Sequence, residues 1–248
     1  MIAFAGCKKD DTLKYNNITM GNIDGDRIIS DQGNTFNIAE SYYGEVDLST
    51  FQYGRVIISC DVLKKTAENQ YDIRLTGIAS VLTKDCMDAS KVTPEHEASV
   101  DDPINIREIW YGGGYINMLI EFAVKTGSES KHLINLIYDD VKLVSDEPEG
   151  ESEAKYTFTL RHNGFGEVPS EENVNNYQFS VGYVSFPIAD IIKEDKAKLV
   201  LNWHSHTLNN YYYNILDSEH RTKTFDWERI GYEQKRGTIT PPALNCLR

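Results

Sequence analysis

Closely spaced histidines are the residues of this sequence that could most readily bind a metal. His204 and His206 flank Ser205, and residues two apart on a strand share one face, so both imidazoles could reach one zinc ion. A zinc site needs a third protein ligand. The nearest candidates along the chain are Asp217, Glu219 and His220, and nothing in the sequence places them opposite this strand. We therefore predict no tightly bound zinc and keep His204 and His206 as weak candidates.

Two further histidines each follow a basic residue, in Lys131-His132 and Arg161-His162. Catalysis by a histidine requires a nucleophile or an orienting carboxylate beside it, and the sequence reveals neither partner. The chain also lacks the short motifs of serine hydrolases, zinc proteases, phosphate-binding loops and dinucleotide-binding domains. We predict that these histidines are structural, that the protein is not an enzyme, and that it uses no cofactor. A secreted hydrolase or metal-binding protein built on the four histidines is the alternative.

Aromatic side chains are the better candidates for ligand binding. Tyr211, Tyr212 and Tyr213 follow two asparagines, and adjacent tyrosines on a polar loop could stack on a sugar or anchor a protein. Trp110 and Tyr115, on either side of a glycine run, are further candidates. The alternative is that alternate rings pack into the interior, because a strand buries about half of such a run.

The composition is that of a folded, acidic protein. Of its 248 residues 40% are hydrophobic and 25% charged, and 38 acids against 25 bases give a net charge of −13. No apolar run is long enough for a transmembrane helix. Negative charge repels phosphate backbones, so we predict no nucleic-acid partner.

Short segments with alternating apolar and polar residues predict an all-β fold of two domains. Their density in the first part is typical of a small OB-like barrel, which we place at residues 19–90. Residues 86–102 contain few strand formers and are the expected linker. Further alternating segments predict a β-sandwich over residues 103–235, followed by an extended tail at residues 236–248.

The N-terminus carries a processing signal. Phe4-Ala5-Gly6-Cys7 is similar to the lipobox of bacterial lipoproteins, and the Lys-Asp-Asp that follows resembles a surface-export signal of Bacteroidetes lipoproteins. The apolar stretch before Cys7 is shorter than a leader peptide, so we expect the leader to begin upstream. We assign residues 1–18 to the leader remnant, the lipidation site and a spacer. Lipid on Cys7 would attach the protein to the outer membrane or cell surface.

The other cysteines do not form a framework. Three cysteines remain, Cys60, Cys86 and Cys246. An odd number without a C-x-x-C spacing excludes a disulfide scaffold and a cysteine zinc site. Cys60 is in register with buried apolar residues, so we expect it to pack as a small hydrophobic side chain. A Cys60–Cys86 disulfide is left open.

Several motifs together resemble the NigD-like lipoproteins. In chain order they are Ser30-Asp31-Gln32-Gly33, Asp102-Pro103-Ile104, the segment from Trp110 to Asn117, Lys131-His132, and Leu160-Arg161-His162-Asn163. The resemblance covers essentially the whole mature chain, and it implies an N-terminal OB domain and a C-terminal β-sandwich. The family is named for a locus linked to a bacteriocin and has no established activity, so the resemblance leaves the function open.

Three functions therefore compete. The preferred one is a lipid-anchored surface protein whose β domains bind an unknown ligand, either a surface protein or a glycan, without catalysis. The second is the histidine-based hydrolase or metal-binding protein. The third is an envelope protein of the immunity type, which the resemblance suggests and which a large exposed apolar patch would favour.

We predict that Cys7 carries lipid when the full leader is present, because the residues before it match the lipobox. Metabolic labelling with an alkynyl fatty acid should mark the wild-type protein and not Cys7→Ser. Equal labelling of the two would contradict this prediction.

Overall fold

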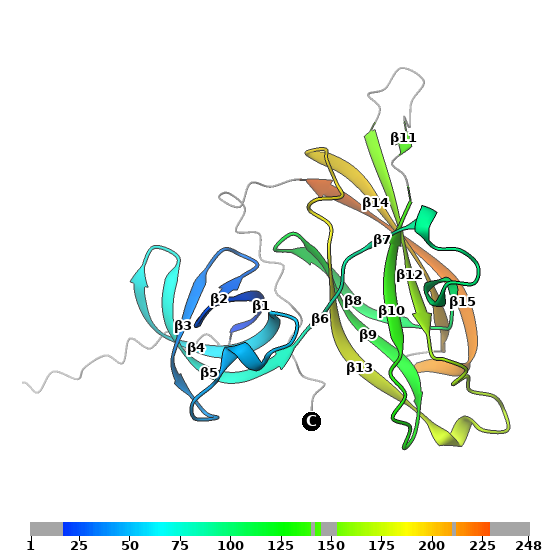
Figure 1. The fold of residues 1–248 in the computed structure, drawn as a ribbon, viewed down its shortest axis with the longest axis horizontal. Coiled ribbons are helices and arrows are strands. Elements are labelled where there is room, and N and C mark those ends of the chain that lie inside the picture. Colours follow the sequence, from blue (N-terminus) through cyan, green and yellow to red (C-terminus); the bar gives the residue numbers. More distant parts are fainter. Residues whose placement is uncertain (1–16, 140–141, 145–152, 210–211, 229–248) are drawn as a thin grey trace, which may run out of the picture. The chain divides into compact units, whose positions relative to one another are not determined.

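The structure, a computed structural model, describes residues 17–139, 142–144, 153–209 and 212–228 (Figure 1). These residues form strands and short 3₁₀ helices, as the predicted all-β fold requires. No helix within them is long and apolar enough to cross a membrane. The chain divides into two compact units between Ser80 and Val81.

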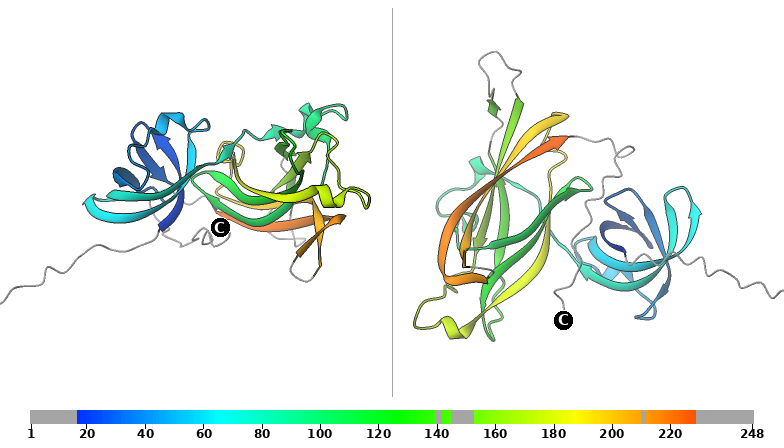
Figure 2. Two further views of the ribbon diagram at one scale, coloured as in Figure 1. Left: turned by 90° about the horizontal axis from the view of Figure 1, so that it is seen from below. Right: turned by 180° about the vertical axis from the view of Figure 1, so that it is seen from behind.

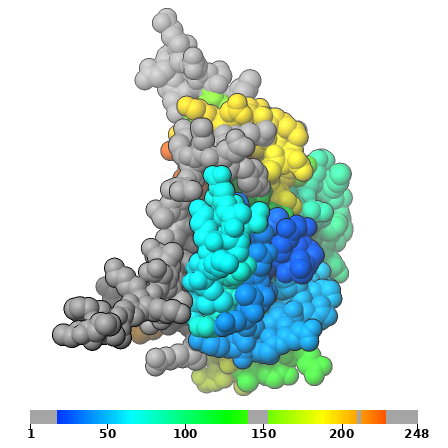
Figure 3. Space-filling model, turned by 90° about the vertical axis from the view of Figure 1, so that its left-hand side faces the viewer, coloured from blue at the N-terminus to red at the C-terminus, as the bar shows by residue number. Residues whose placement is uncertain are grey.

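The first unit is a closed five-stranded barrel with the strand order β1-β2-β3-β5-β4. Its strands are β1 (Asn17–Asp24), β2 (Arg27–Ser30), β3 (Thr35–Ser41), β4 (Arg55–Ala67) and β5 (Gln70–Ser80). Only β3 and β5 pair in parallel, and β1 closes the barrel against β4. Alternate residues of β4 point inward, including Cys60, which is fully buried in the barrel core as expected. Figure 3 shows one outer face of this unit.

The second unit is a β-sandwich of two sheets, seen as separate layers in Figure 2. The larger sheet has the order β15-β14-β12-β10-β7, with β11 also paired to β12, and the smaller one has the order β6-β13-β9-β8. The strands are β6 (Leu82–Thr83), β7 (Met87–Asp88), β8 (Asn105–Gly112), β9 (Tyr115–Lys125), β10 (Leu133–Tyr138), β11 (Lys142–Val144), β12 (Glu153–Asn163), β13 (Tyr177–Pro187), β14 (Lys196–Asn209) and β15 (Tyr212–Glu228).

Strict alternation along β12 aims its even-numbered residues at the core between the sheets. Tyr156, Phe158 and Leu160 are fully buried there, and His162 continues the same face. The predicted glycine turn lies at Gly113 and Gly114, whose φ angles are 61° and 89°. Positive φ at both positions suits glycine and lets β8 turn directly into β9.

The segment expected to be a linker is part of the sandwich. β6 pairs with β13, and β7 pairs with β10, so the division of the chain at Ser80 comes before the predicted domain end at residue 90. Two-residue strands joined by polar turns carry too little alternation to be recognised in the sequence. The proposed tail at residues 236–248 lies outside the described residues.

The cysteines of the described chain are free. Cys60 and Cys86 form no disulfide, so the open Cys60–Cys86 alternative is wrong. Burial raises the pKa of both thiols to about 12, which makes them poor nucleophiles. Cys246 lies outside the described residues.

A buried ion pair crosses the barrel at the motif Ser30-Asp31-Gln32-Gly33. Both guanidinium NH groups of Arg55 donate to the carboxylate of Asp31, at 2.9 and 2.8 Å. The side chains are only 1% and 5% exposed. Arg55 also donates to Asn22 Oδ1 at 3.1 Å. Removing one charge would leave the other buried without its counter-ion.

We predict that Asp31→Ala lowers the free energy of unfolding of the barrel by about 3–5 kcal/mol, because it removes the carboxylate that pairs with the buried Arg55 guanidinium. Chemical denaturation measures the loss. Asp24→Ala is the control, since Asp24 pairs with Arg27 at the surface and should cost at most about 1 kcal/mol. Equal losses in the two variants would contradict the assigned role of Asp31.

Candidate functional site

A short stretch before β8, residues 101–104, joins two strands of the larger sheet, and we call it the bridging segment. The pairing of β12 with β14 stops short of their C-terminal ends. Beyond that point the N–H of Asp102 donates to His162 O on β12 at 2.9 Å. The N–H of Ile104 donates to His204 O on β14 at 2.8 Å. The bridging segment thus continues the hydrogen bonding of both strands where their own pairing ends.

The rings of the same two histidines hold the bridging segment a second time. His162 Nδ1 lies 3.1 Å from Pro103 O. His204 Nδ1 lies 2.6 Å from Asp101 O. A carbonyl oxygen only accepts hydrogen bonds, so each ring carries a hydrogen on Nδ1. Each histidine therefore binds the segment through both its main chain and its side chain.

A chain of hydrogen bonds runs on from His162. Its Nε2 lies 2.8 Å from His132 Nδ1. Burial lowers the pKa of His162 to about 4, and the nearby His132 adds to this effect, so Nε2 of His162 is an acceptor at neutral pH. On its other side, His132 Nε2 lies 3.4 Å from the carboxylate of Glu167. Because Nε2 of His162 accepts, Nδ1 of His132 donates the hydrogen bond between the two rings.

Glu167 ends this chain as a carboxylate. Hydrogen bonds, above all from the Ser128 hydroxyl, hold its pKa at about 2 although partial burial opposes them. The N–H of Lys125 also donates to it, at 3.3 Å. The ring of Phe122 packs against the rings of His132 and His162, with ring centroids 4.9 and 5.1 Å apart. Glu167 thus fastens the loop after β12 to the end of β9 and to His132.

The other polar residues around His162 are also bound within the protein. Arg161 forms an ion pair with Asp101. Asn163 Nδ2 donates to Glu97 O at 3.0 Å, and the N–H of Gly164 donates to the Asp102 carboxylate at 2.8 Å. Three of the motifs that carried the family resemblance, those at Asp102-Pro103-Ile104, His132 and Arg161-His162-Asn163, therefore come together around the bridging segment.

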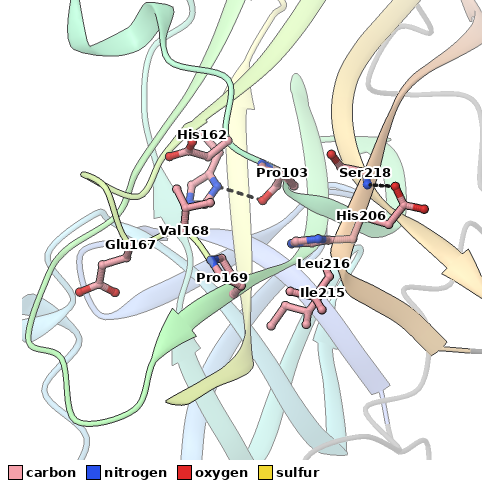
Figure 4. Close-up of a pocket in the computed structure, with 12 residues that line it drawn as sticks. Pro103, His162, Glu167, Val168, Pro169, His206, Ile215, Leu216 and Ser218 are labelled. Carbon is pink, nitrogen blue, oxygen red and sulfur yellow. Dashed lines mark hydrogen bonds between the residues drawn. The ribbon is translucent and has the colours of Figure 1, made fainter. Parts of the chain in front are cut away.

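A pocket of about 110 Å³ lies beside this cluster (Figure 4). Its apolar wall consists of Pro103, Ala123, Val168, Pro169, Ile215 and Leu216. Its polar lining consists of Asp102, His162, Glu167, His206, Asp217 and Ser218. The residues come from the bridging segment, β9, β12 and its following loop, β14 and β15. Asp102 and Asp217 give the lining an acidic character, whereas the side chain of Glu167 points away from the pocket (Figure 4) and its carboxylate is bound by Ser128 and Lys125.

Unlike the rings of His132, His162 and His204, the ring of His206 is not tied to the described residues by hydrogen bonds. It is 2% exposed, and neither ring nitrogen has a hydrogen-bond partner among the described residues. Figure 4 shows the ring extending into the pocket. The ring also packs edge-on against Phe179, with ring centroids 5.4 Å apart. Burial lowers its pKa; the backbone of Asp217 and Asn214, near the ring, partly opposes this shift without a well-formed hydrogen bond. A neutral ring offers one donor and one acceptor.

The two metal candidates lie in different surroundings. His204 is bonded at both nitrogens and stacks on His220 at 4.6 Å, whereas His206 lines the pocket. In the described part of the chain, no three His, Cys, Asp or Glu side chains converge to hold a metal ion. The absence of zinc stays a prediction for elemental analysis.

The aromatic candidates do not form one site. Tyr212 is 80% exposed, while Tyr213 packs its ring near Phe179 with centroids 6.4 Å apart. Trp110 packs edge-on against Tyr183 at 6.4 Å, within the smaller sheet. The half-buried Tyr115 follows the glycine turn. None of these lines the pocket, and Tyr211 lies outside the described residues.

Sequence reasoning missed one pairing that could do chemistry. Ser218 Oγ lies 2.9 Å from His204 Nε2, and His204 is oriented from its other nitrogen by Asp101 O. This order of hydroxyl, imidazole and orienting oxygen is that of an activated serine. Ser218 and Glu167 belong to no recognisable motif, so only the strand register could reveal them.

Comparison with protein families identifies the chain. The model of the NigD-like C-terminal β-sandwich domain matches residues 88–215, slightly more than half of the sequence. The chain belongs to the NigD-like family. The match covers the bridging segment, His132, His162, His204 and His206, whereas Ser218 lies beyond its end. No curated protein matches the chain.

Solved structures share the fold over most of this NigD-like chain. A NigD-like immunity protein from Bacteroides caccae is 15% identical, with a TM-score of 0.58 over 86% of this chain and 96% of that one. A protein from Bacteroides fragilis described as a candidate lipoprotein is 12% identical, with a TM-score of 0.56 over 86% and 97%. A protein of unknown function from Bacteroides vulgatus is 17% identical, with a TM-score of 0.58 over 88% and 94%. At these identities the likeness concerns the fold alone.

We predict that acid weakens this NigD-like sandwich through His162. Its folded pKa of about 4 is below the ordinary 6.5, so the unfolded chain takes up the proton first. The free energy of unfolding should fall as the pH drops from 6.5 to 4, by about 3 kcal/mol at most. The contribution of Glu167, whose folded pKa is about 2, is lost at lower pH, between 4.5 and 2.

His162→Asn tests this assignment, because an amide can still donate to Pro103 O but does not titrate. Its unfolding free energy should vary less between pH 7 and 4 than that of the wild type, measured by urea denaturation. His96→Asn is the matched control, since His96 is an exposed histidine outside the cluster and asparagine can still accept from the Ala98 N–H. An unchanged pH dependence in His162→Asn would show that other groups cause the acid loss.

Proposed function

We propose that this NigD-like protein is a non-catalytic binding protein of the cell envelope, anchored by lipid on Cys7, and that its ligand is another protein. One observation carries the proposal: the polar residues that a catalyst would use are occupied in holding the bridging segment. His132, His162 and His204 each have both ring nitrogens engaged by protein groups. A general base needs a nitrogen that substrate or water can reach, which His132 and His162 lack, and Nε2 of His204 reaches only the Ser218 hydroxyl, considered below.

A protein ligand fits the site better than a glycan. The pocket is far below the roughly 300–1,000 Å³ typical of small-molecule sites. The tyrosines that could stack on a sugar are spread apart, and the ring of Tyr213 is partly covered by Phe179. Exposed apolar side chains beside the pocket, Val168 and Leu216, are 51% and 44% exposed and suit a protein contact.

The envelope location rests on the sequence and on descriptions of proteins with this fold. Cys7 follows a lipobox-like segment. Proteins with this fold include one described as an immunity protein and one described as a candidate lipoprotein. Both descriptions support a protein that acts at the envelope by binding.

Capture on the immobilised chain, from Asp10 onward, tests the binding function. Proteins released from the surface of the producing cells should include one that binds saturably and is displaced by excess soluble chain. A parallel glycan array should show no specific signal. Glycan binding without a protein partner, or turnover of a substrate, would contradict the proposal.

A serine hydrolase is the second candidate, and the Ser218–His204 contact favours it. Acyl transfer forms an oxyanion, which needs N–H donors. The N–H of Ser218 instead donates to the Asp217 carboxylate at 2.9 Å. Together with Asp102, which also lines the pocket, this carboxylate would repel the oxyanion. The electrostatics therefore oppose the chemistry that the hydrogen bond would permit.

We predict that Ser218→Ala hydrolyses p-nitrophenyl acetate at the wild-type rate, because the wild type has no catalytic serine. Release of p-nitrophenol near pH 7.5 measures this. Ser49→Ala, at an exposed serine of the barrel, serves as the control. A large loss of rate confined to Ser218→Ala would instead establish the hydrolase.

A further inference from the structure

We propose that the pocket beside the bridging segment binds the side chain of one lysine or arginine of a basic protein partner. This inference rests on the proposed binding function and names the chemistry of its site. It assigns a role to Asp102, Asp217 and His206. The hydrogen bonds of the bridging segment do not fully account for the presence of these three residues at the pocket.

The size of the pocket limits its occupant to one side chain. A dry cavity of about 150 Å³ accommodates one benzene molecule. The present pocket, at about 110 Å³, therefore suits a single extended side chain and is too small for a cofactor or a sugar chain. Binding one side chain of a protein is how an anchor residue enters an interface.

The lining suits a side chain with an apolar stem and a cationic head. Val168, Pro169 and Leu216 offer an apolar wall, along which the methylene stem of lysine or arginine can lie. Asp102 and Asp217 offer carboxylate oxygens in the same pocket. The Asp102 carboxylate accepts a hydrogen bond from one N–H group, and the Asp217 carboxylate accepts from one N–H group and one hydroxyl. These donors are uncharged, so the negative charge of both carboxylates remains to be neutralised.

His206 gives a second, independent indication of a ligand. A buried imidazole with both nitrogens unpaired destabilises a protein by the cost of desolvating polar atoms. This ring extends into the pocket (Figure 4). In its neutral form it can accept a hydrogen bond from a cationic head group.

Other occupants fit less well. An acidic side chain would meet a pocket whose lining includes Asp102 and Asp217. A purely apolar side chain would fill the wall but leave the same charges and His206 without partners. The net charge of the whole chain, −13, also attracts a basic partner over longer distances.

Four short peptides, identical except for a central lysine, arginine, norleucine or glutamate, test the proposal. Each is titrated into the full chain while NMR follows the ring resonance of His206, assigned with His206→Phe. The lysine or the arginine peptide should shift this resonance saturably. Norleucine, which keeps the stem of lysine without its charge, should bind about tenfold more weakly or not at all, and glutamate should not bind.

Asp217→Asn supplies the matched variant, because the amide keeps the shape of the side chain. It should weaken binding of the basic peptide about tenfold. Asp226→Asn, the same charge change on an exposed residue of β15 outside the pocket, should have little effect. Thermal unfolding of both variants controls for folding.

Several results would overturn the inference. Equal binding of norleucine and lysine would make the pocket merely apolar, and binding of glutamate would reverse its sign. If Asp226→Asn weakened binding of the basic peptide as much as Asp217→Asn does, the effect would come from the overall charge of the protein and not from the pocket. If no peptide binds although a captured partner does, the pocket assignment fails while the binding function stands; the binding function itself fails only if capture yields no partner.

Discussion

The sandwich of this NigD-like chain depends on how the bridging segment is held between β12 and β14. Main-chain hydrogen bonds to His162 and His204 continue the sheet across residues 101–104, and the two rings bind carbonyl oxygens of the same segment. This arrangement fixes a hydrogen on Nδ1 of each ring. The direction of every further hydrogen bond, through His132 to Glu167, follows from that one constraint.

The same constraint separates a structural cluster from a catalytic one. His132 and His162, whose nitrogens are engaged by other side chains and by Pro103 O, orient loops and strands, and we propose that they have no catalytic role. The cluster leaves beside it a small acidic pocket in which the His206 ring alone lacks hydrogen-bond partners among the described residues around it. Carboxylates there disfavour an oxyanion and favour a cation, so one observation argues both against hydrolysis and for a basic ligand.

The sequence predicted what depends on local pattern and missed what depends on register. Alternation along β12 indicated a strand, and the inward position of His162 follows from the same period. The contact between His132 and His162 arises because β10 pairs with β12 so that Leu133 faces Asn163, and no local pattern encodes that pairing. The same holds for the Ser218–His204 contact and for the early domain boundary, where β6 and β7 are too short to show a period.

The most direct test of this account is the protonation of the imidazoles themselves. Long-range ¹H–¹⁵N correlation spectra at pH 7 report which ring nitrogens carry hydrogen. The account predicts a neutral His162 with its hydrogen on Nδ1, and a hydrogen on Nδ1 of both His204 and His132. A hydrogen on Nε2 of His162, or none on Nδ1 of His132, would reverse the chain of hydrogen bonds and contradict the structural role assigned to the cluster.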